Sequence, residues 1–226
     1  MNQLEIIRTV AYGGFFLLLF GLAEILFHYA KIQAEITRKM VHIGTGLITL
    51  TFPIFLTTHW SVLILTISFV VILSISARMD ILKSINSIDR FSRGSILYPI
   101  IIYATYWNFT LFDDVLFFYL PILILAICDP IAALTGRKWP WGKYRIWKET
   151  KTLMGSSAFF ISCFILTIVF ATPLRSSWIE IIAVTFFISL FTTIAEAVSQ
   201  KGWDNLFIPL TVTFTLLISE YLFHFS

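Results

Sequence analysis

The sequence predicts an all-α, polytopic integral membrane protein that forms a single transmembrane domain over residues 1–226. Three observations lead to this fold class. Hydrophobic residues make up 58% of the chain and charged residues only 13%, against about 45–50% and about 25% in soluble domains. Apolar runs of membrane-spanning length recur along the chain, and nearly all basic residues lie in every second connection. This composition excludes a cytosolic globule, a disordered tail and a nucleic-acid-binding module.

The apolar runs predict eight transmembrane helices, within a range of seven to nine. A membrane-crossing helix needs about 20 residues. Runs of this kind fall at about 8–29, 40–58, 60–77, 96–112, 115–134, 155–173, 178–198 and 205–225. A membrane β-barrel would show short segments of alternating polarity, and these runs do not alternate.

The basic residues predict the orientation of the helices. All but two of the sixteen lie in the connections at about 30–39, 78–95, 135–154 and 199–204, and the exceptions are Arg8 and Arg175. The positive-inside rule therefore places these four connections in the cytoplasm and both termini outside. We expect the inner membrane if the host is bacterial and an organelle membrane if it is eukaryotic.

The connection 78–95 has a pattern of its own. Apolar residues recur there at helical spacing between charges, namely Ile81 or Leu82, Ile85, Ile88 and Phe91. This spacing predicts a helix that lies in the membrane interface. Such a helix would either anchor the chain or control the entry of lipid to a site.

Acidic and amide side chains gather near the cytoplasmic ends of the predicted spans. A charged residue inside a span costs about 2.5–3.5 kcal/mol on insertion scales, so each one needs a reason. Asp129 ends the fifth apolar run, Glu196 lies near the end of the seventh, and Asp204 and Asn205 open the eighth. Carboxylates with an amide suit Mg²⁺, which takes one or two carboxylates plus substrate phosphates. The alternative is a set of helix caps and ion pairs, with Asp204 as an N-cap.

The connection 135–154 is more basic than membrane topology requires. It carries six positive charges, one acid and three tryptophans. A surplus of cations at a membrane face fits a bound anion, and opposite the acidic group it predicts a nucleotide-phosphate site. A soluble-type P-loop is excluded, because five residues separate Gly136 from Gly142 where four are needed, and Tyr144 stands where Ser or Thr binds the metal.

Four strings carry a resemblance to a known family. They are RKMVHIGTGL (38–47), CDPIAALTGRKWPWGKY (128–144), KTLMGSS (151–157) and AEAVSQKGWDNLFIP (195–209). In this order and spacing they resemble the membrane-embedded CTP-dependent lipid kinases, which include phytol kinase, dolichol kinase and the CTP-dependent diacylglycerol kinase. The Lys-Thr-x-x-Gly-Ser form looks closest to the phytol-kinase branch.

The resemblance implies a kinase that transfers the γ-phosphate of CTP to the hydroxyl of a membrane lipid at the cytoplasmic face, with Mg²⁺ as cofactor. The lipid would be an isoprenoid alcohol such as phytol, geranylgeraniol or a polyprenol, or diacylglycerol. One alternative is a phosphatidate cytidylyltransferase that forms a CDP-lipid, although its Gly-Gly-x-x-Asp-Arg-x-Asp signature is missing. A small transporter ranks third, because the ionisable residues crowd one face. The sequence leaves the oligomeric state open, and a homo-oligomer is one possibility.

The resemblance, together with the charge pattern, also supplies the candidate site residues. The nucleotide-binding candidates are Arg38, Lys39, Gly136, Arg137, Lys143, Lys148, Lys151, Thr152, Gly155 and Asn205. The catalytic candidates are Asp129, Asp204, Glu196 and His42, of which Asp204, Glu196 and His42 compete as general base. The expected Mg²⁺ ligands are Asp129, Asp204 and Asn205.

Overall fold

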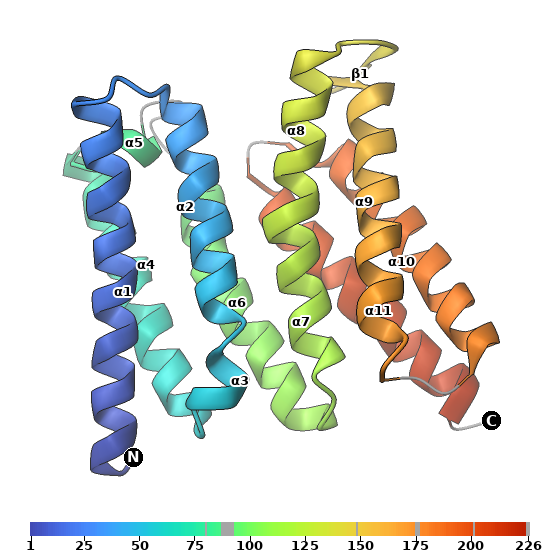
Figure 1. Ribbon diagram of the computed structural model, residues 1–226, viewed down its shortest axis with the longest axis horizontal. Helices are drawn as coiled ribbons and strands as arrows, with labels where there is room; N and C mark the ends of the chain where they lie inside the picture. The colour runs from blue at the N-terminus through green and yellow to red at the C-terminus, as the bar shows by residue number, and fades with distance from the viewer. Residues whose placement is uncertain (80, 87–92, 148, 175–176, 201, 225–226) are drawn as a thin grey trace.

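The computed structural model describes residues 1–79, 81–86, 93–147, 149–174, 177–200 and 202–224. Long helices run side by side along most of the chain (Figure 1). They are α1 (Gln3–His28), α2 (Ala34–Thr49), α4 (His59–Met79), α6 (Arg93–Phe112), α9 (Leu153–Ala171), α10 (Trp178–Val198) and α11 (Asp204–His224). A further rod is built from α7 (Leu116–Leu123), the π-helix η1 (Ile124–Cys128) and α8 (Asp129–Lys138). Two short helices, α3 (Phe52–Phe55) and α5 (Lys83–Asn86), complete the helical part.

Six of the described helices are long and apolar enough to cross a membrane, fewer than the eight expected. These are α1, α4, the rod Leu116–Lys138, α9, α10 and the span Asp204–Phe223. Helices α2 and α6 lie where the second and fourth spans were expected, but they are not among the six. The second apolar run does not form one helix because of Pro53: α2 ends at Thr49, and Pro53 lies in the first turn of the short α3, which begins at Phe52. The six helices therefore support the prediction of a helical membrane protein, and the count of eight spans stays a prediction.

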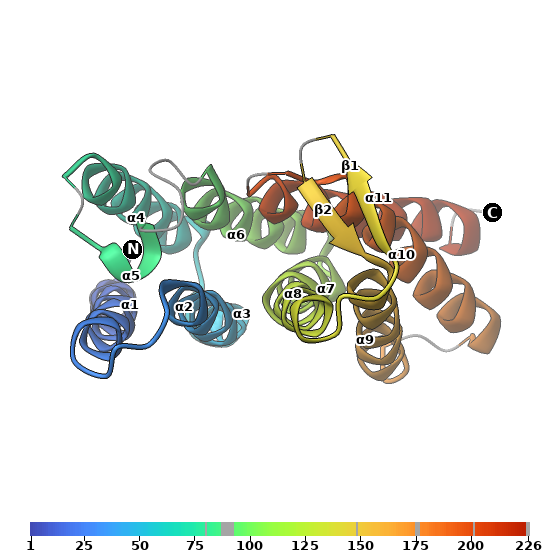
Figure 2. The ribbon, with the colours of Figure 1, turned by 90° about the horizontal axis from the view of Figure 1, so that it is seen from above.

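The basic connection 135–154 is not the open loop that an all-α fold implies. Helix α8 continues to Lys138, and the antiparallel strands β1 (Lys143–Ile146) and β2 (Glu149–Thr152) then form a hairpin. Lys143 pairs with Thr152 at the base of the hairpin, and Ile146 pairs with Glu149 at its tip. Figure 2 shows the hairpin reaching from α8 and α9 toward α10 and α11.

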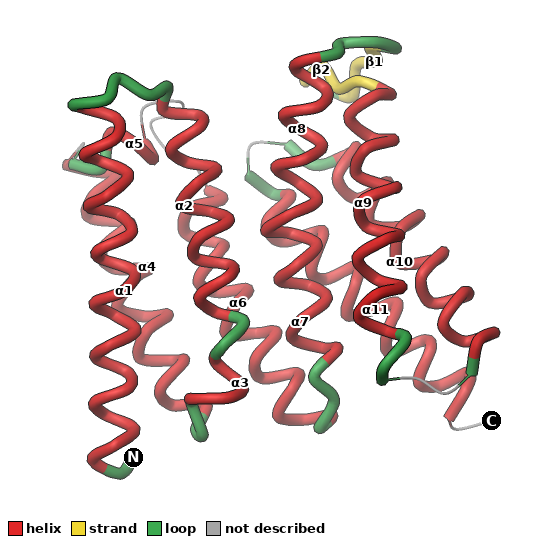
Figure 3. The backbone as a smooth tube through the Cα atoms, in the orientation of Figure 1, coloured by secondary structure: helices red, strands yellow, loops and turns green. Residues whose placement is uncertain are grey.

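The two ends of the bundle differ in what they carry. Both termini lie at one end, together with α3 and the turn between α6 and α7 (Figures 1 and 3). The hairpin, the α1–α2 turn and α5 lie at the opposite end. This arrangement keeps the two termini on one side, while the side that faces the cytoplasm remains a prediction from charge.

The interface helix expected from the 78–95 pattern is short where the structure describes it. Only α5 is formed, and Ile85 is 4% exposed because α5 packs against α1 and α2. The Ser84 amide donates to Glu24 Oε1 at 2.8 Å, and Thr37 Oγ1 donates to the Ser84 carbonyl at 2.9 Å. Ile88 and Phe91 lie outside the described residues.

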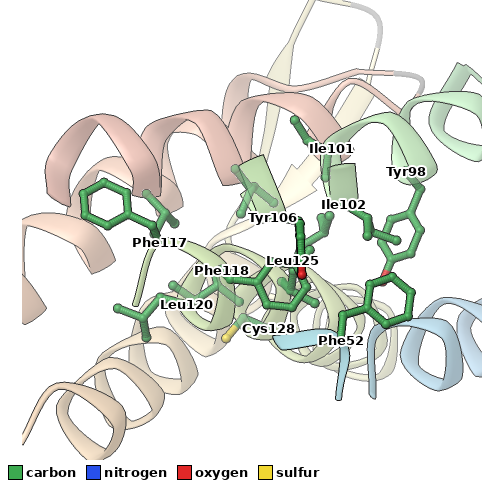
Figure 4. Packing of buried hydrophobic residues seen from close by; sticks show 14 of the residues in the cluster. Phe52, Tyr98, Ile101, Ile102, Tyr106, Phe117, Phe118, Leu120, Leu125 and Cys128 are labelled. Atoms are coloured by element: carbon green, nitrogen blue, oxygen red, sulfur yellow. The ribbon is translucent and has the colours of Figure 1, made fainter. Parts of the chain in front are cut away.

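The rod of α7 and η1 is the centre of the core. Phe117, Phe118, Leu120 and Leu125 are fully buried, and Figure 4 shows them among side chains from the surrounding helices. A run of apolar residues with no polar face is typical of a helix enclosed on all sides. This central rod leads directly into α8, whose first residue is Asp129, with a side chain that is 16% exposed.

Candidate functional site

A cavity of about 630 Å³ runs from the hairpin end of the bundle into the space between α1, α2, α4 and α6. Its lining has two parts. The part near the hairpin is charged and polar, and it includes Glu35, Arg38, Lys39, Asp129, Arg137, Lys151, Glu196, Asp204 and Asn205. The other part is an apolar arm, lined by Phe16, Phe20, Phe52, Leu65, Phe69, Leu73 and Ile102.

Three of the ion pairs in the described part of the chain cross the charged part of the cavity, and each joins two different elements. Lys39 Nζ of α2 lies 3.6 Å from Asp129 Oδ2 of α8. The Arg137 guanidinium of α8 pairs with the Glu35 carboxylate of α2. Because these cations are already matched by carboxylates, an incoming anion has to compete with the protein's own acids.

The third pair fixes Lys151, on strand β2, against α10. Its Nζ donates to Glu196 Oε1 at 2.5 Å and to the Glu196 carbonyl at 3.1 Å. Burial alone would lower the pKa of the Lys151 ammonium, but Glu196, with Asp204 and Asp129 further away, raises this pKa above its ordinary value of 10.5. Lys151 therefore stays charged at neutral pH, within the field of three carboxylates.

Strand β2 also starts helix α9. Thr152 is the N-cap of α9, and its Oγ1 accepts from the Gly155 amide at 3.0 Å. A Cβ on Gly136 would lie 2.5 Å from Thr152 Oγ1 and 3.3 Å from the Gly155 Cα. Gly136 and Gly155, two of the nucleotide-binding candidates, let α8 and α9 approach closely beside the cavity.

His42 is held by a backbone carbonyl of η1. In the i→i+5 pattern of a π-helix, the Leu125 carbonyl would pair with residue 130, which is a proline and has no N–H. His42 Nε2 lies 3.0 Å from the Leu125 oxygen and must donate to it, because a carbonyl only accepts. The other ring nitrogen, Nδ1, is then the one that can accept a proton.

Asn205 joins α11 to α6. Its Nδ2 donates to the Gly94 carbonyl at 2.8 Å, and its backbone amide donates to Asp204 Oδ1 at 2.9 Å. A Cβ on Gly94 would lie 2.9 Å from Asn205 Nδ2, so this approach needs a glycine. The bond from Nδ2 to Gly94 fixes the orientation of the amide, and Oδ1 is its only atom that can bind a cation.

The donor set fits an ion that also takes substrate oxygens. In the part of the chain that the structure describes, no three His, Cys, Asp or Glu side chains are grouped as metal ligands. Asp129 and Asp204 with the Asn205 amide offer two carboxylates and one neutral oxygen along the same cavity. Mg²⁺ is held in this way when phosphates supply the other ligands.

Most of the predicted site residues line this cavity. These are Arg38, Lys39, His42, Asp129, Gly136, Arg137, Lys151, Thr152, Gly155, Glu196, Asp204 and Asn205. Lys143 is not part of the lining and is exposed on β1, and Lys148 lies outside the described residues.

Glu35 was not among the candidates, although its position carried a signal. Glu35, Arg38, Lys39 and His42 recur at the spacing of one helix face, and all four line the cavity on α2. Residues 30–39 were expected to form a connection between two spans, so this helix face was not predicted. Ser95, Tyr98 and other uncharged lining residues gave no signal of their own.

A helical membrane bundle with a cavity that is charged at one end and apolar at the other defines a membrane protein built to hold an amphipathic molecule. The chain is 29% identical over 188 residues to phytol kinase of Synechocystis sp. (strain ATCC 27184 / PCC 6803 / Kazusa). The aligned residues cover 83% of this chain and 81% of that protein. This similarity confirms the resemblance to the phytol-kinase-like lipid kinases that the four motifs indicated. No protein-family model and no solved structure matches the chain.

Proposed function

We propose that this protein is a lipid-alcohol kinase that transfers the γ-phosphate of CTP to the hydroxyl of an isoprenoid alcohol at the cytoplasmic face of its membrane. The similarity to a phytol kinase supports a phosphotransferase with an alcohol acceptor. The observation that carries the proposal is the continuity of one cavity from a charged cluster to an apolar arm. A phosphate donor and a lipid hydroxyl can meet there while the tail stays away from water.

The triphosphate would lie at the charged end, against Arg38, Arg137 and Lys151. These residues come from α2, α8 and β2, so an anion between them would be contacted from three sides. The transferred phosphoryl group needs little covalent help, and positioning with charge neutralisation supplies most of the catalysis. Glu35 would release Arg137 when the nucleotide competes for the guanidinium.

Asp129, Asp204 and the Asn205 amide oxygen would hold Mg²⁺, which neutralises charge on the phosphates. The lipid hydroxyl also needs a group that accepts its proton within hydrogen-bond distance. Glu196 is the weakest of the three candidates because its Oε1 is engaged by Lys151 at 2.5 Å. Asp204 and, through Nδ1, His42 remain, and Asp204→Asn and His42→Gln variants separate them by their pH–rate profiles.

The direct test is phosphoryl transfer by the purified protein in lipid nanodiscs. Labelled CTP is offered with phytol, geranylgeraniol, undecaprenol or diacylglycerol, and ATP replaces CTP in parallel. We expect a phosphorylated isoprenoid alcohol, formed only with Mg²⁺ present. Release of pyrophosphate with a CDP-lipid product would instead identify a cytidylyltransferase, and solute uptake into proteoliposomes without any transfer would identify a transporter.

Two lysines of the hairpin provide a matched pair for this assay. Lys151 lines the cavity, whereas Lys143, on the neighbouring strand, is exposed and does not. Lys151→Met should lower the transfer rate at least ~100-fold, the scale of losing one preorganised electrostatic group. Lys143→Met removes the same charge from the same hairpin and should stay within about threefold of the parent, on the scale of a surface charge.

A further inference from the structure

A cluster of aromatic rings lines the apolar arm of the cavity, and one of them, Phe52, belongs to α3, at the end of the bundle that carries the termini (Figure 1). Phe52 of α3 lies with its ring centroid 6.2 Å from that of Phe16, and Phe16 lies 5.2 Å from Phe69, both in edge-to-face contact. Phe20 extends the cluster, 5.7 Å from Phe69. Phe52 is 1% exposed, and Figure 4 shows it among the buried side chains of Tyr98, Ile102 and Tyr106.

The segment that carries Phe52 is tied to the helices on both sides of it. Thr51 Oγ1 donates to the Ile48 carbonyl at 2.7 Å, so the Tyr12 hydroxyl, 2.5 Å away, must donate to Thr51 Oγ1. On the other side, the Tyr106 hydroxyl donates to the Leu56 carbonyl at 2.6 Å. These bonds join α3 to α1 and to α6.

A buried carboxylate holds the segment that follows. Glu5 is 2% exposed, and its Oε1 accepts from the Thr57 amide at 3.0 Å and from Ser61 Oγ at 2.6 Å. Its Oε2 accepts from Thr57 Oγ1 at 2.9 Å. A carboxylate with all its bonds made inside the bundle resists displacement, because moving the segment would leave a buried charge without partners.

The side walls of the arm are joined in the same way. Thr66 Oγ1 of α4 donates to the Pro99 carbonyl of α6 at 3.2 Å. The Tyr98 hydroxyl of α6 donates to the His42 carbonyl of α2 at 3.1 Å. Helices α1 and α4 meet through the Phe16–Phe69 contact, so bonded or packed pairs surround the arm.

The arm is also short. Phe52 lies ten positions after His42 along the chain, and both line the cavity. Because α2 ends at Thr49, the helical rise gives a depth of at most about 15 Å. That is about half of a hydrocarbon core, which is about 30 Å thick. The whole cavity of about 630 Å³, which the nucleotide phosphates would share, is of the size that encloses one small ligand.

We propose that Phe52, held in place with α3, is a chain-length stop that restricts the lipid substrate to alcohols with one short tail. The inference rests on the proposed function and narrows its substrate class. A tail of the length of geranylgeraniol or phytol folds into the arm, whereas an undecaprenyl chain meets the ring of Phe52. The two chains of diacylglycerol require twice the apolar space that a single arm offers.

The test is a ladder of isoprenoid alcohols from geraniol through farnesol and geranylgeraniol to undecaprenol, with binding and turnover measured separately. Native mass spectrometry of the intact protein in detergent gives the alcohols retained, and the transfer assay gives kcat/KM for each. We expect both to peak at or below geranylgeraniol, and kcat/KM for undecaprenol to be at least ~100-fold lower. Phe52→Ala should raise kcat/KM for longer prenols at least ~10-fold relative to kcat/KM for geranylgeraniol. The reason is that one methylene more or less in an apolar pocket already changes the preference between two substrates by about 10–200-fold.

Two further variants keep the test decisive if Phe52→Ala folds poorly. Thr49→Leu, one turn nearer the charged end, should shift the peak toward farnesol by filling the arm. Phe159→Ala removes an equally buried ring that is not part of the cavity lining, and it should leave the length profile unchanged. A flat profile in the parent protein, or the same profile in the Phe52 and Thr49 variants, would overturn the stop while leaving the kinase intact. Absence of transfer to every alcohol would refute the kinase, and the retained alcohols would still report on the stop.

Discussion

Replacing Lys151 by methionine tests the charged end of the cavity most sharply, because the structure separates the effect on folding from the effect on activity. The ammonium of Lys151 is bonded to Glu196, and their side chains are only 21% and 8% exposed. Lys151→Met therefore leaves Glu196 as a buried carboxylate without its counter-ion.

The size of the loss follows from this burial. Breaking one partner of a fully buried pair costs about 3–5 kcal/mol. Since a fifth of the Lys151 side chain remains accessible, some water can replace it, and we expect about 2–3 kcal/mol. For a chain of this size, that corresponds to a fall in Tm of roughly 4–12 °C. The double variant Lys151→Met/Glu196→Gln removes both charges and should recover most of the loss.

The assay is thermal unfolding in detergent, followed by tryptophan fluorescence, with phosphoryl transfer measured on the same samples. Both variants should be at least ~100-fold slower than the parent, because neither offers an ammonium to the phosphates. The reasoning fails if Lys151→Met unfolds at the parent's temperature, or if the double variant is no more stable than the single one. Recovery of full activity in the double variant would remove Lys151 from the nucleotide site.

Three other predictions follow from the same geometry. Asp129→Asn should lower kcat at least ~100-fold, and a rate near that of the parent would remove Asp129 from the metal site. Gly136→Ala places a Cβ 2.5 Å from Thr152 Oγ1, so it should destabilise the protein by about 1–3 kcal/mol in thermal unfolding, whereas Gly21→Ala, with nothing within 4 Å of its Cβ, should not. The raised pKa of Lys151 predicts that its contribution to stability is fully present below 10.5 and is lost only as the pH rises through the higher pKa of the folded state. A difference in Tm between the parent and Lys151→Met that shrinks as the pH rises from neutrality to 10.5 would contradict this.

The positions of the long helices could be predicted because membrane-spanning helices are formed by the apolar runs that hydropathy identifies. The run 178–198 coincides with α10, Trp178–Val198, since an apolar stretch between a serine N-cap and a polar turn has no competing structure. The first turns of α2 were missed for the same reason. Glu35, Arg38 and Lys39 make that segment polar, and hydropathy does not distinguish a polar loop from a helix whose polar face lines a cavity.

The sequence predicted which residues belong to the site but not how they contact one another. The motifs selected Lys143 and Lys151 alike, because both are lysines of one basic connection. Only the hairpin shows that Lys151 reaches Glu196 while Lys143 is exposed. The stop at Phe52 gave no signal either, because the chain has 23 phenylalanines and nothing local indicates which ring faces a cavity.

Between α8 and α9, the position of the Lys151 ammonium depends on the number of residues in the hairpin more than on which residues these are. Successive residues of a strand point to opposite faces, so Lys151 reaches Glu196 while its neighbour Thr152 begins α9. Inserting a single residue between Lys151 and Thr152 would turn the ammonium to the other face, whereas substitutions at the exposed tip residue Trp147 leave the register alone. We therefore expect this segment to tolerate changes of side chain at the tip of the hairpin more readily than a one-residue insertion next to Lys151.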